Sequence, residues 1–274
     1  MRFLLTMLLL LIAIVSFGCP RPQKPNTDGQ TDISKLNDPL DVLLKRYVKD
    51  GRVDYAAWKN NAADVQALET YLNSLADIRA DNIESYGDRK AFWVNAYNAF
   101  GIKLVLDRYP IKSISFDEKT NNDPKVKGFL GDPDRKIGTV VVSLDDIEQE
   151  RADTRTNPML HFVMSKPAVG SPDLQPFVLR GKNLEAQIDQ AAKAFLQDPT
   201  KGMRINVDEK KVYLSNIFKQ YRLEFGGDLS AFVRPHISAD QQAKMDSINK
   251  NQIDFDFLPF DWQLNDVVHG KPAK

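Results

Sequence analysis

The sequence has few of the residues on which many kinds of protein chemistry depend. It contains one cysteine, Cys19, and three histidines among 274 residues. A lone cysteine cannot form an internal disulfide bond, so the fold must be held by its apolar core. Lysine plus arginine and aspartate plus glutamate number 37 each, which leaves no net charge. This balance lacks the basic excess of nucleic-acid-binding proteins, and we expect no nucleic acid among the partners.

Several well-known site motifs are also missing. The sequence has no phosphate-binding glycine loop, no HExxH helix and no G-x-S-x-G turn around a serine. Three acidic residues, Asp145, Asp146 and Glu148, stand close together, but their spacing fits no calcium loop. Acidic residues at the start of a helix are explained by the helix dipole alone. We therefore expect neither a metal nor a cofactor.

The one long hydrophobic run lies at the N-terminus. Met1 and Arg2 give a short positive end, and the chain from Phe3 to Val15 is almost continuously apolar. This layout is typical of an export signal. Because the run is shorter than the roughly 17–25 residues that a spanning helix needs, a permanent transmembrane anchor is the weaker interpretation. We predict a signal peptide over residues 1–18.

Cys19 follows this run directly and resembles the acylated cysteine of a bacterial lipoprotein. Ser16 and Phe17 depart from the usual residues before such a cysteine, so an ordinary cleaved signal with an incidental cysteine is the alternative. Two or more acyl chains would anchor the protein stably to a membrane. Pro20, in place of the aspartate that retains lipoproteins in the inner membrane, favours the outer membrane. We expect a periplasm-facing protein of the cell envelope, attached through Cys19.

Residues 19–38 are rich in polar residues and proline and predict a flexible tether. A single domain is expected over residues 39–268, followed by a tail over 269–274. The helix from about Asp88 to Arg108 is apolar nearly all round, which indicates the centre of the core. Other helices are predicted near residues 40–48, 65–75, 184–195, 215–221, 229–235 and 239–249.

Strands are fewer. Residues 137–142 (IGTVVV) predict one short strand, and residues 205–214 predict a hairpin around a polar turn. Residues 253–257 alternate apolar and acidic side chains, as a strand with one buried face does. Residues 111–136 read mainly as a long surface excursion. The predicted fold class is α+β, predominantly helical, with a small and mainly antiparallel sheet.

Five segments, taken in order, carry a family resemblance: AFWVNAYNAFGIKLVLDRYPIKSI, SLDDIE, NPMLHFVMSKPAVGSPDL, YLSNIFKQYRLEF and FLPFDWQLND. Together they resemble the bacterial domain of unknown function 547, over residues 41–266. The resemblance implies a shared fold and no agreed activity. It also implies that many relatives carry histidine where this chain has Gln149, and cysteines where it has Lys166 and Ser171. Any thiolate chemistry of such relatives is therefore closed to this chain.

Five residues, two asparagines, a histidine and two serines, are candidates for a site. Asn95 and Asn98 share one helix face, and they either hydrogen-bond neighbouring loop backbone or line a pocket for a ligand. His161, in the apolar run LHFVM, is either a satisfied core residue or a general base whose partner is Ser165 or Ser171.

The function expected from the sequence is non-catalytic binding of a small ligand or an envelope partner. The ligand-binding candidates are Asn95, Asn98, Lys166 and Gln149. The alternative is a hydrolase or acyl-transfer enzyme that uses His161 with a serine. A purely structural interaction protein is a third hypothesis, and it predicts an exposed apolar patch without a pocket.

Overall fold

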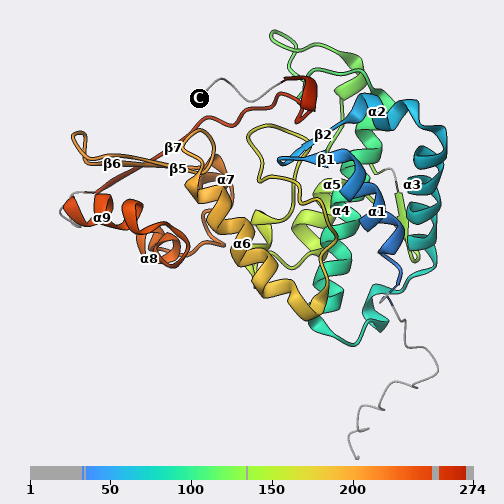
Figure 1. The fold of residues 1–274 in the computed structure, drawn as a ribbon, viewed down its shortest axis with the longest axis horizontal. Coiled ribbons are helices and arrows are strands. Elements are labelled where there is room, and N and C mark those ends of the chain that lie inside the picture. Colours follow the sequence, from blue (N-terminus) through green and yellow to red (C-terminus); the bar gives the residue numbers. More distant parts are fainter. Residues whose placement is uncertain (1–32, 34, 134, 249–252, 270–274) are drawn as a thin grey trace, which may run out of the picture. The chain divides into compact units, whose positions relative to one another are not determined.

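One long helix, α4 (Tyr86–Arg108), forms the centre of the fold (Figure 1). The computed structural model describes residues 33, 35–133, 135–248 and 253–269. Every residue of α4 from Lys90 to Leu106 is buried except Asn98. The Ser85 side chain caps the first turn by accepting a hydrogen bond from the Asp88 amide, and the helix ends before Tyr109 and a cis Pro110. The predicted central helix is confirmed.

Three N-terminal helices precede α4: α1 (Asp38–Tyr47), α2 (Tyr55–Asn60) and α3 (Ala62–Ser74). The helices α2 and α3 pack against α4, and α1 packs on α3 and α2. Between α1 and α2, a two-stranded hairpin joins β1 (Val48–Lys49) to β2 (Arg52–Val53). The sequence predicted α1 and α3 but not α2, whose first turn is capped by Asp54. Packing starts before Pro39, since Ile33 already lies in the core.

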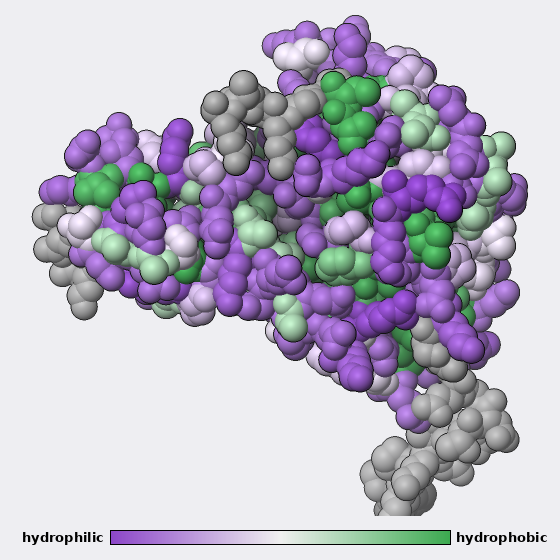
Figure 2. Space-filling model, viewed as in Figure 1, coloured by the Kyte–Doolittle hydropathy of each residue, from purple (hydrophilic) through white to green (hydrophobic). Residues whose placement is uncertain are grey.

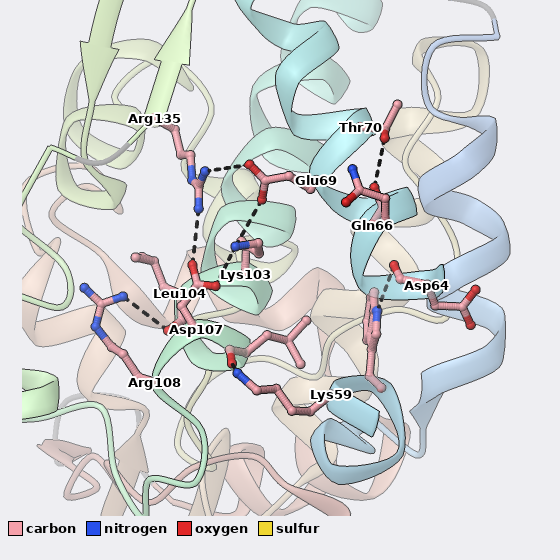
Figure 3. A network of polar contacts seen from close by, with 12 residues as sticks. Lys59, Asp64, Gln66, Glu69, Thr70, Lys103, Leu104, Asp107, Arg108 and Arg135 are labelled. Atoms are coloured by element: carbon pink, nitrogen blue, oxygen red, sulfur yellow. Dashed lines mark hydrogen bonds and ion pairs between the residues drawn. The ribbon is translucent and has the colours of Figure 1, made fainter. Parts of the chain in front are cut away.

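Charged side chains join α3 and α4 to the strand β3 (Arg135–Ile137), as Figure 3 shows. Lys103 lies 3.0 Å from Glu69 and 2.5 Å from Asp107. Arg135 reaches the same two carboxylates at 3.2 and 3.3 Å. Lys103 and Arg135 are largely buried, so each carboxylate is shared by two enclosed cations. These charge-assisted contacts link the two helices to the strand.

The segment 137–142 is not the single strand that was predicted. Residues 135–142 form a hairpin of β3 and β4 (Val140–Val142), with Ile137 opposite Val140. Gly138 adopts a φ of +56°, and its amide donates to the Leu75 carbonyl at 3.3 Å. A positive φ at glycine turns the chain sharply, and this breaks the β-branched run into two strands.

The segment 111–136 is only partly a surface excursion. Four of its apolar side chains are buried in the core, namely Ile111, Ile114, Val126 and Phe129. The prediction of a mainly exposed segment was therefore wrong at these positions. The polar residues between them form turns, among them the short 3-10 helix η4 (Pro124–Val126).

The C-terminal part contains the predicted hairpin, β5 (Met203–Asn206) with β6 (Lys211–Leu214). β7 (Asp254–Phe257) pairs with β6, but in the parallel sense. Its phenylalanines are half-buried and its aspartates exposed, as the alternation predicted. The helices of this part are α6 (Leu184–Gln197), α7 (Asn216–Gln220), α8 (Leu229–Val233) and α9 (Ala239–Ser247).

Short helices connect these elements. α5 (Leu144–Asp146) continues into one turn of π-helix, η5 (Ile147–Arg151). The 3-10 helices are η2 (Leu75–Asp77), η3 (Ala80–Asn82), η6 (Pro158–Phe162), η7 (Gly181–Asn183), η8 (Arg234–His236) and η10 (Val267–His269). The fold is α+β and predominantly helical, with small and mainly antiparallel sheets, as predicted.

The buried apolar residues form two clusters. The larger surrounds α4, and the smaller lies among α6, α7, α8 and the β5–β6–β7 sheet. On the face drawn in Figure 2, hydrophobic residues are interspersed with hydrophilic ones. Within the described residues, no helix has the length and apolar character needed to cross a membrane. Cys19 and the predicted signal peptide lie outside the described residues.

Candidate functional site

His161 lies at the boundary between the two apolar clusters. It belongs to η6, a 3-10 helix that begins at Pro158, and not to a strand. The preceding residue, Leu160, packs in the larger cluster, and the following residue, Phe162, packs in the smaller one. Only 2% of the His161 surface is exposed. A polar ring in this position must find its partners inside the protein.

Those partners are two glutamates. The Nε2 atom of His161 lies 2.8 Å from an oxygen of Glu224, and its Nδ1 atom lies 3.7 Å from Glu148 Oε1. The Tyr221 ring stacks on the imidazole with 4.0 Å between ring centroids, and Phe225 lies 5.6 Å away. The imidazole is thus held between two carboxylates and covered by aromatic rings.

Lys166 completes the cluster. Its ammonium donates to both oxygens of Glu148 at 2.7 Å and lies 3.4 Å from the Tyr221 hydroxyl. Glu148 is 3% exposed and Lys166 is 7% exposed, so this ion pair is almost fully removed from water. We call Glu148, His161, Lys166, Tyr221 and Glu224 the buried charge cluster. It opens towards solvent at Glu224, whose side chain is 17% exposed.

The turn that carries Glu148 is set by local sequence. The Ser143 and Asp146 side chains form a reciprocal cap at the start of α5. The π-helical turn that follows directs Glu148 inward, and its carbonyl accepts a hydrogen bond from the buried Thr154 hydroxyl at 3.3 Å. Asp146 therefore lies in the first turn of a helix, as its position predicted, and its carboxylate completes the cap formed by Ser143. Glu148 instead forms a buried ion pair, which the helix dipole does not explain.

The electrostatics of the cluster favour its charged forms. Burial by itself raises the pKa of Glu148, but Lys166 and the bonds from His161 outweigh it and lower the pKa to about 2. Burial likewise lowers the pKa of His161, but hydrogen bonds to Glu148 and Glu224 outweigh this and raise it above its ordinary value. The pKa of Glu224 is lowered, because contact with His161 outweighs its partial burial. The three shifts favour two carboxylates facing two cations.

Tyr97 adds an unusual feature beside this cluster. Its hydroxyl, on α4, is buried and has no hydrogen-bond partner among the described residues. Burial, followed by the charge of Glu148 and the neighbouring Tyr221 and Asp145, raises the pKa of Tyr97 far above its ordinary range. The phenol is therefore neutral, and in this state it can donate a hydrogen bond.

The carboxamides of Asn95 and Asn98 bind backbone. Asn95 donates to the carbonyl of Leu179 and accepts from its amide, both at 2.9 Å. Asn98 donates to the Val163 carbonyl at 3.0 Å and accepts from the Ser165 amide at 2.9 Å. Of the two hypotheses for these residues, the structure shows the one in which they fix neighbouring loops to α4.

Neither candidate serine is hydrogen-bonded to His161 in the described part of the chain. The Ser165 hydroxyl donates to the Pro172 carbonyl at 2.7 Å, and the buried Ser171 offers its own carbonyl to Lys201 at 3.0 Å. Gln149 is exposed on η5, beside the inward-facing Glu148.

Among the described side chains, no group of three or more histidine, cysteine or acidic residues is arranged to hold a metal ion. Glu148 and Lys166, which could have served as ligand and activating group, neutralise each other.

Two residues of this site, Tyr221 and Glu224, were not predicted from the sequence. Glu224 and Tyr221 lie 63 and 60 positions after His161, too far for any local spacing to connect them. The available signal was the segment YLSNIFKQYRLEF, in which Tyr221 and Glu224 lie three positions apart. In a helical turn this spacing places both side chains on one face.

The fold and the cluster define an α+β domain in which two carboxylates, a lysine and a histidine are buried between two apolar clusters. Residues 82–196 match the model of the family described as protein of unknown function, DUF547. The matched segment holds Glu148, His161 and Lys166, whereas Tyr221 and Glu224 follow it. Neither the curated proteins nor the solved structures give a match.

Proposed function

We propose that this chain is an exported, lipid-anchored protein of the cell envelope whose domain binds a small ligand or an envelope partner without turning it over. Export and the anchor at Cys19 are supported by the N-terminal sequence: a positive end, an apolar run and a cysteine directly after it. The part of the polar stretch that precedes Ile33 would hold the domain away from the lipid surface and leave it free to meet its partner.

One observation supports binding over catalysis. Both ring nitrogens of His161 face carboxylates, and the Ser165 hydroxyl is used by the Pro172 carbonyl. A serine nucleophile needs a base within hydrogen-bond reach to take its proton. The hydrolase or acyl-transfer alternative, in which His161 serves as that base, therefore lacks the contact on which it depends. The buried charge cluster instead acts as a structural link between the two apolar clusters.

A turnover assay separates the two functions. The full chain would be incubated with a panel of ester, thioester and peptide substrates, alongside a His161→Gln variant. The matched control is His236→Gln, because His236 also pairs with a carboxylate, Asp189, at 3.0 Å. We expect no turnover that depends on His161. Turnover by the wild type that is lost in folded His161→Gln but kept in His236→Gln would overturn the binding proposal.

The anchor is tested separately. Cells that express the chain would be labelled with a clickable palmitate analogue and fractionated. We expect label on the wild type, an outer-membrane location, and loss of both in Cys19→Ser. A periplasmic, unlabelled wild-type protein would instead indicate an ordinary cleaved signal peptide.

A further inference from the structure

A groove of about 540 Å³ is lined by none of the residues of the buried charge cluster. Four segments line it: residues 78–82, the start of α4, the β3–β4 turn and the end of η5. Its volume falls in the range of roughly 300–1,000 Å³ that is usual for sites that bind small molecules. We call it the arginine groove, after Arg79, Arg89 and Arg151.

The groove is lined by more positive than negative side chains. Three arginines line it, with Asp81 as the one lining carboxylate. Within the described part of the chain, the guanidinium groups of Arg79 and Arg89 form no hydrogen bond or ion pair with another residue. Arg151 lies near enough to Asp146 to lower the pKa of that carboxyl, though the bonds to Ser143 have the larger effect. Guanidinium groups without protein partners are available to a ligand.

A second concavity provides a contrast. It has a similar volume, about 500 Å³, and is formed by the β5–β6 hairpin. Arg204 is its arginine, but Asp208 and Glu209 line it too, and Glu209 accepts a hydrogen bond from the Tyr213 hydroxyl. Its two carboxylates outnumber its one arginine, so this concavity has a surplus of negative charge, whereas the arginine groove has a surplus of positive charge.

The arginine groove also has an apolar wall and a fixed frame. Trp93 lies one helical turn after Arg89, on the same face of α4, and lines the groove together with Ile78 and Val140. The β3–β4 turn lies so close to residue 78 that a Cβ atom at Gly138 would lie 2.9 Å from the Ile78 carbonyl oxygen, and the Gly138 amide donates a hydrogen bond to the Leu75 carbonyl. A frame that is close-packed in this way keeps the groove open before any ligand arrives.

We propose that the arginine groove binds a small organic anion that carries two or more phosphate or carboxylate groups beside an apolar portion. This inference rests on the proposed binding function and gives it a site and a ligand class. Planar guanidinium groups bind such oxyanions through paired hydrogen bonds. Trp93 and Val140 provide the surface against which the apolar portion packs.

The test is calorimetric titration of the full chain with two probes, inorganic pyrophosphate and citrate. We expect saturable binding of at least one probe, and the probe that binds distinguishes a phosphate from a carboxylate ligand. In the triple variant Arg79→Gln/Arg89→Gln/Arg151→Gln, the affinity should fall at least about tenfold, since charge-assisted hydrogen bonds are lost. Arg204→Gln in the hairpin concavity is the matched control and should bind as the wild type does.

Three outcomes would overturn the proposal: no saturable binding of either probe to the wild type, equal affinity in the triple variant, or an equal loss in Arg204→Gln. Circular dichroism of each variant shows that it is folded, and the three arginines are exposed or half-buried, so their loss leaves the core intact. A failure here leaves the proposed binding function standing. Turnover that depends on His161 would remove that function whatever the groove does.

Discussion

The ammonium of Lys166 lies 2.7 Å from each carboxylate oxygen of Glu148, and both side chains are buried. Removing one partner of such a pair leaves an uncompensated charge inside the protein. This relationship, between a turn of π-helix and the loop after η6, links two parts of the chain that are 18 positions apart. It leads to the first prediction.

Replacement of Lys166 by methionine should lower the free energy of unfolding by about 3–5 kcal/mol, the usual cost of leaving one buried charge unpaired. The measurement is urea denaturation of the full chain. Lys244→Met is the control, because Lys244 forms an exposed ion pair with Asp240 and should cost less than about 1 kcal/mol. The double variant Lys166→Met/Glu148→Gln should recover part of the loss. Equal effects in the buried and the exposed variants would contradict this account.

Stability should depend on pH through His161 and Glu148. The pKa of His161 is raised in the folded state, so its contribution is full below about 6.5 and is lost as the pH rises through the folded value. The pKa of Glu148 is lowered to about 2, so its contribution is present above its ordinary value of 4.5 and is lost as the pH falls towards 2. Between these two pH values, both contributions are present.

The measurement for this prediction is the urea midpoint across pH 4 to 9, compared between wild type and His161→Gln. The difference between the two proteins should be largest near pH 5–6 and should shrink at alkaline pH, since the proton on His161 is then lost in both states. A difference that stays constant from pH 5 to 9 would mean that His161 contributes through packing with Tyr221 and not through charge.

Asn95 should matter for stability although it lies in a helix. Asn95→Ala removes the donor and the acceptor that satisfy the buried amide and carbonyl of Leu179, and should cost about 1–3 kcal/mol for each group left unpaired. Asn73→Ala, at an exposed position of α3, should stay within about 0.5 kcal/mol of the wild type. Thermal unfolding measures both. A neutral Asn95→Ala would show that water satisfies the Leu179 backbone equally well.

The β3–β4 turn should tolerate no side chain at Gly138. Its φ of +56° and the 2.9 Å approach to the Ile78 carbonyl oxygen predict that Gly138→Ala lowers stability by about 1–3 kcal/mol. The matched control is Gly227→Ala, because a Cβ atom there would meet nothing within 4 Å. The two variants are compared by urea denaturation. Similar losses of stability in the two variants would show that a side chain at Gly138 causes no strain of its own.

Much of the local structure could be predicted from the sequence. The central helix was visible because residues 91–106 are apolar on nearly every side. The β5–β6 hairpin was visible because two alternating segments flank a polar turn. The β3–β4 hairpin was missed, since six β-branched and small residues look like one strand until Gly138 turns the chain. The burial of Val126 and Phe129 was missed for a related reason, because the polar residues around them dominate the local pattern.

The candidate site was predictable only in part. His161, Lys166 and the two asparagines stood out by type and position, and Glu148 was noticed as one of three acids at a helix start. The partners that decide what His161 does, Glu148 and Glu224, lie 13 positions before it and 63 after it. Neither the helical nor the strand period relates residues that are so far apart in the sequence.

The sequence by itself determined where helices and hairpins form, which face of each is apolar, and that one cysteine follows an export-like leader. These properties depend on neighbours within a few positions, because backbone hydrogen bonds and side-chain periods are local. Only the tertiary structure decided that His161 faces two carboxylates and no serine, and that Arg79, Arg89 and Arg151 line one groove. Charge pairing and grooves depend on distance in space, and the packing of the apolar core sets that distance.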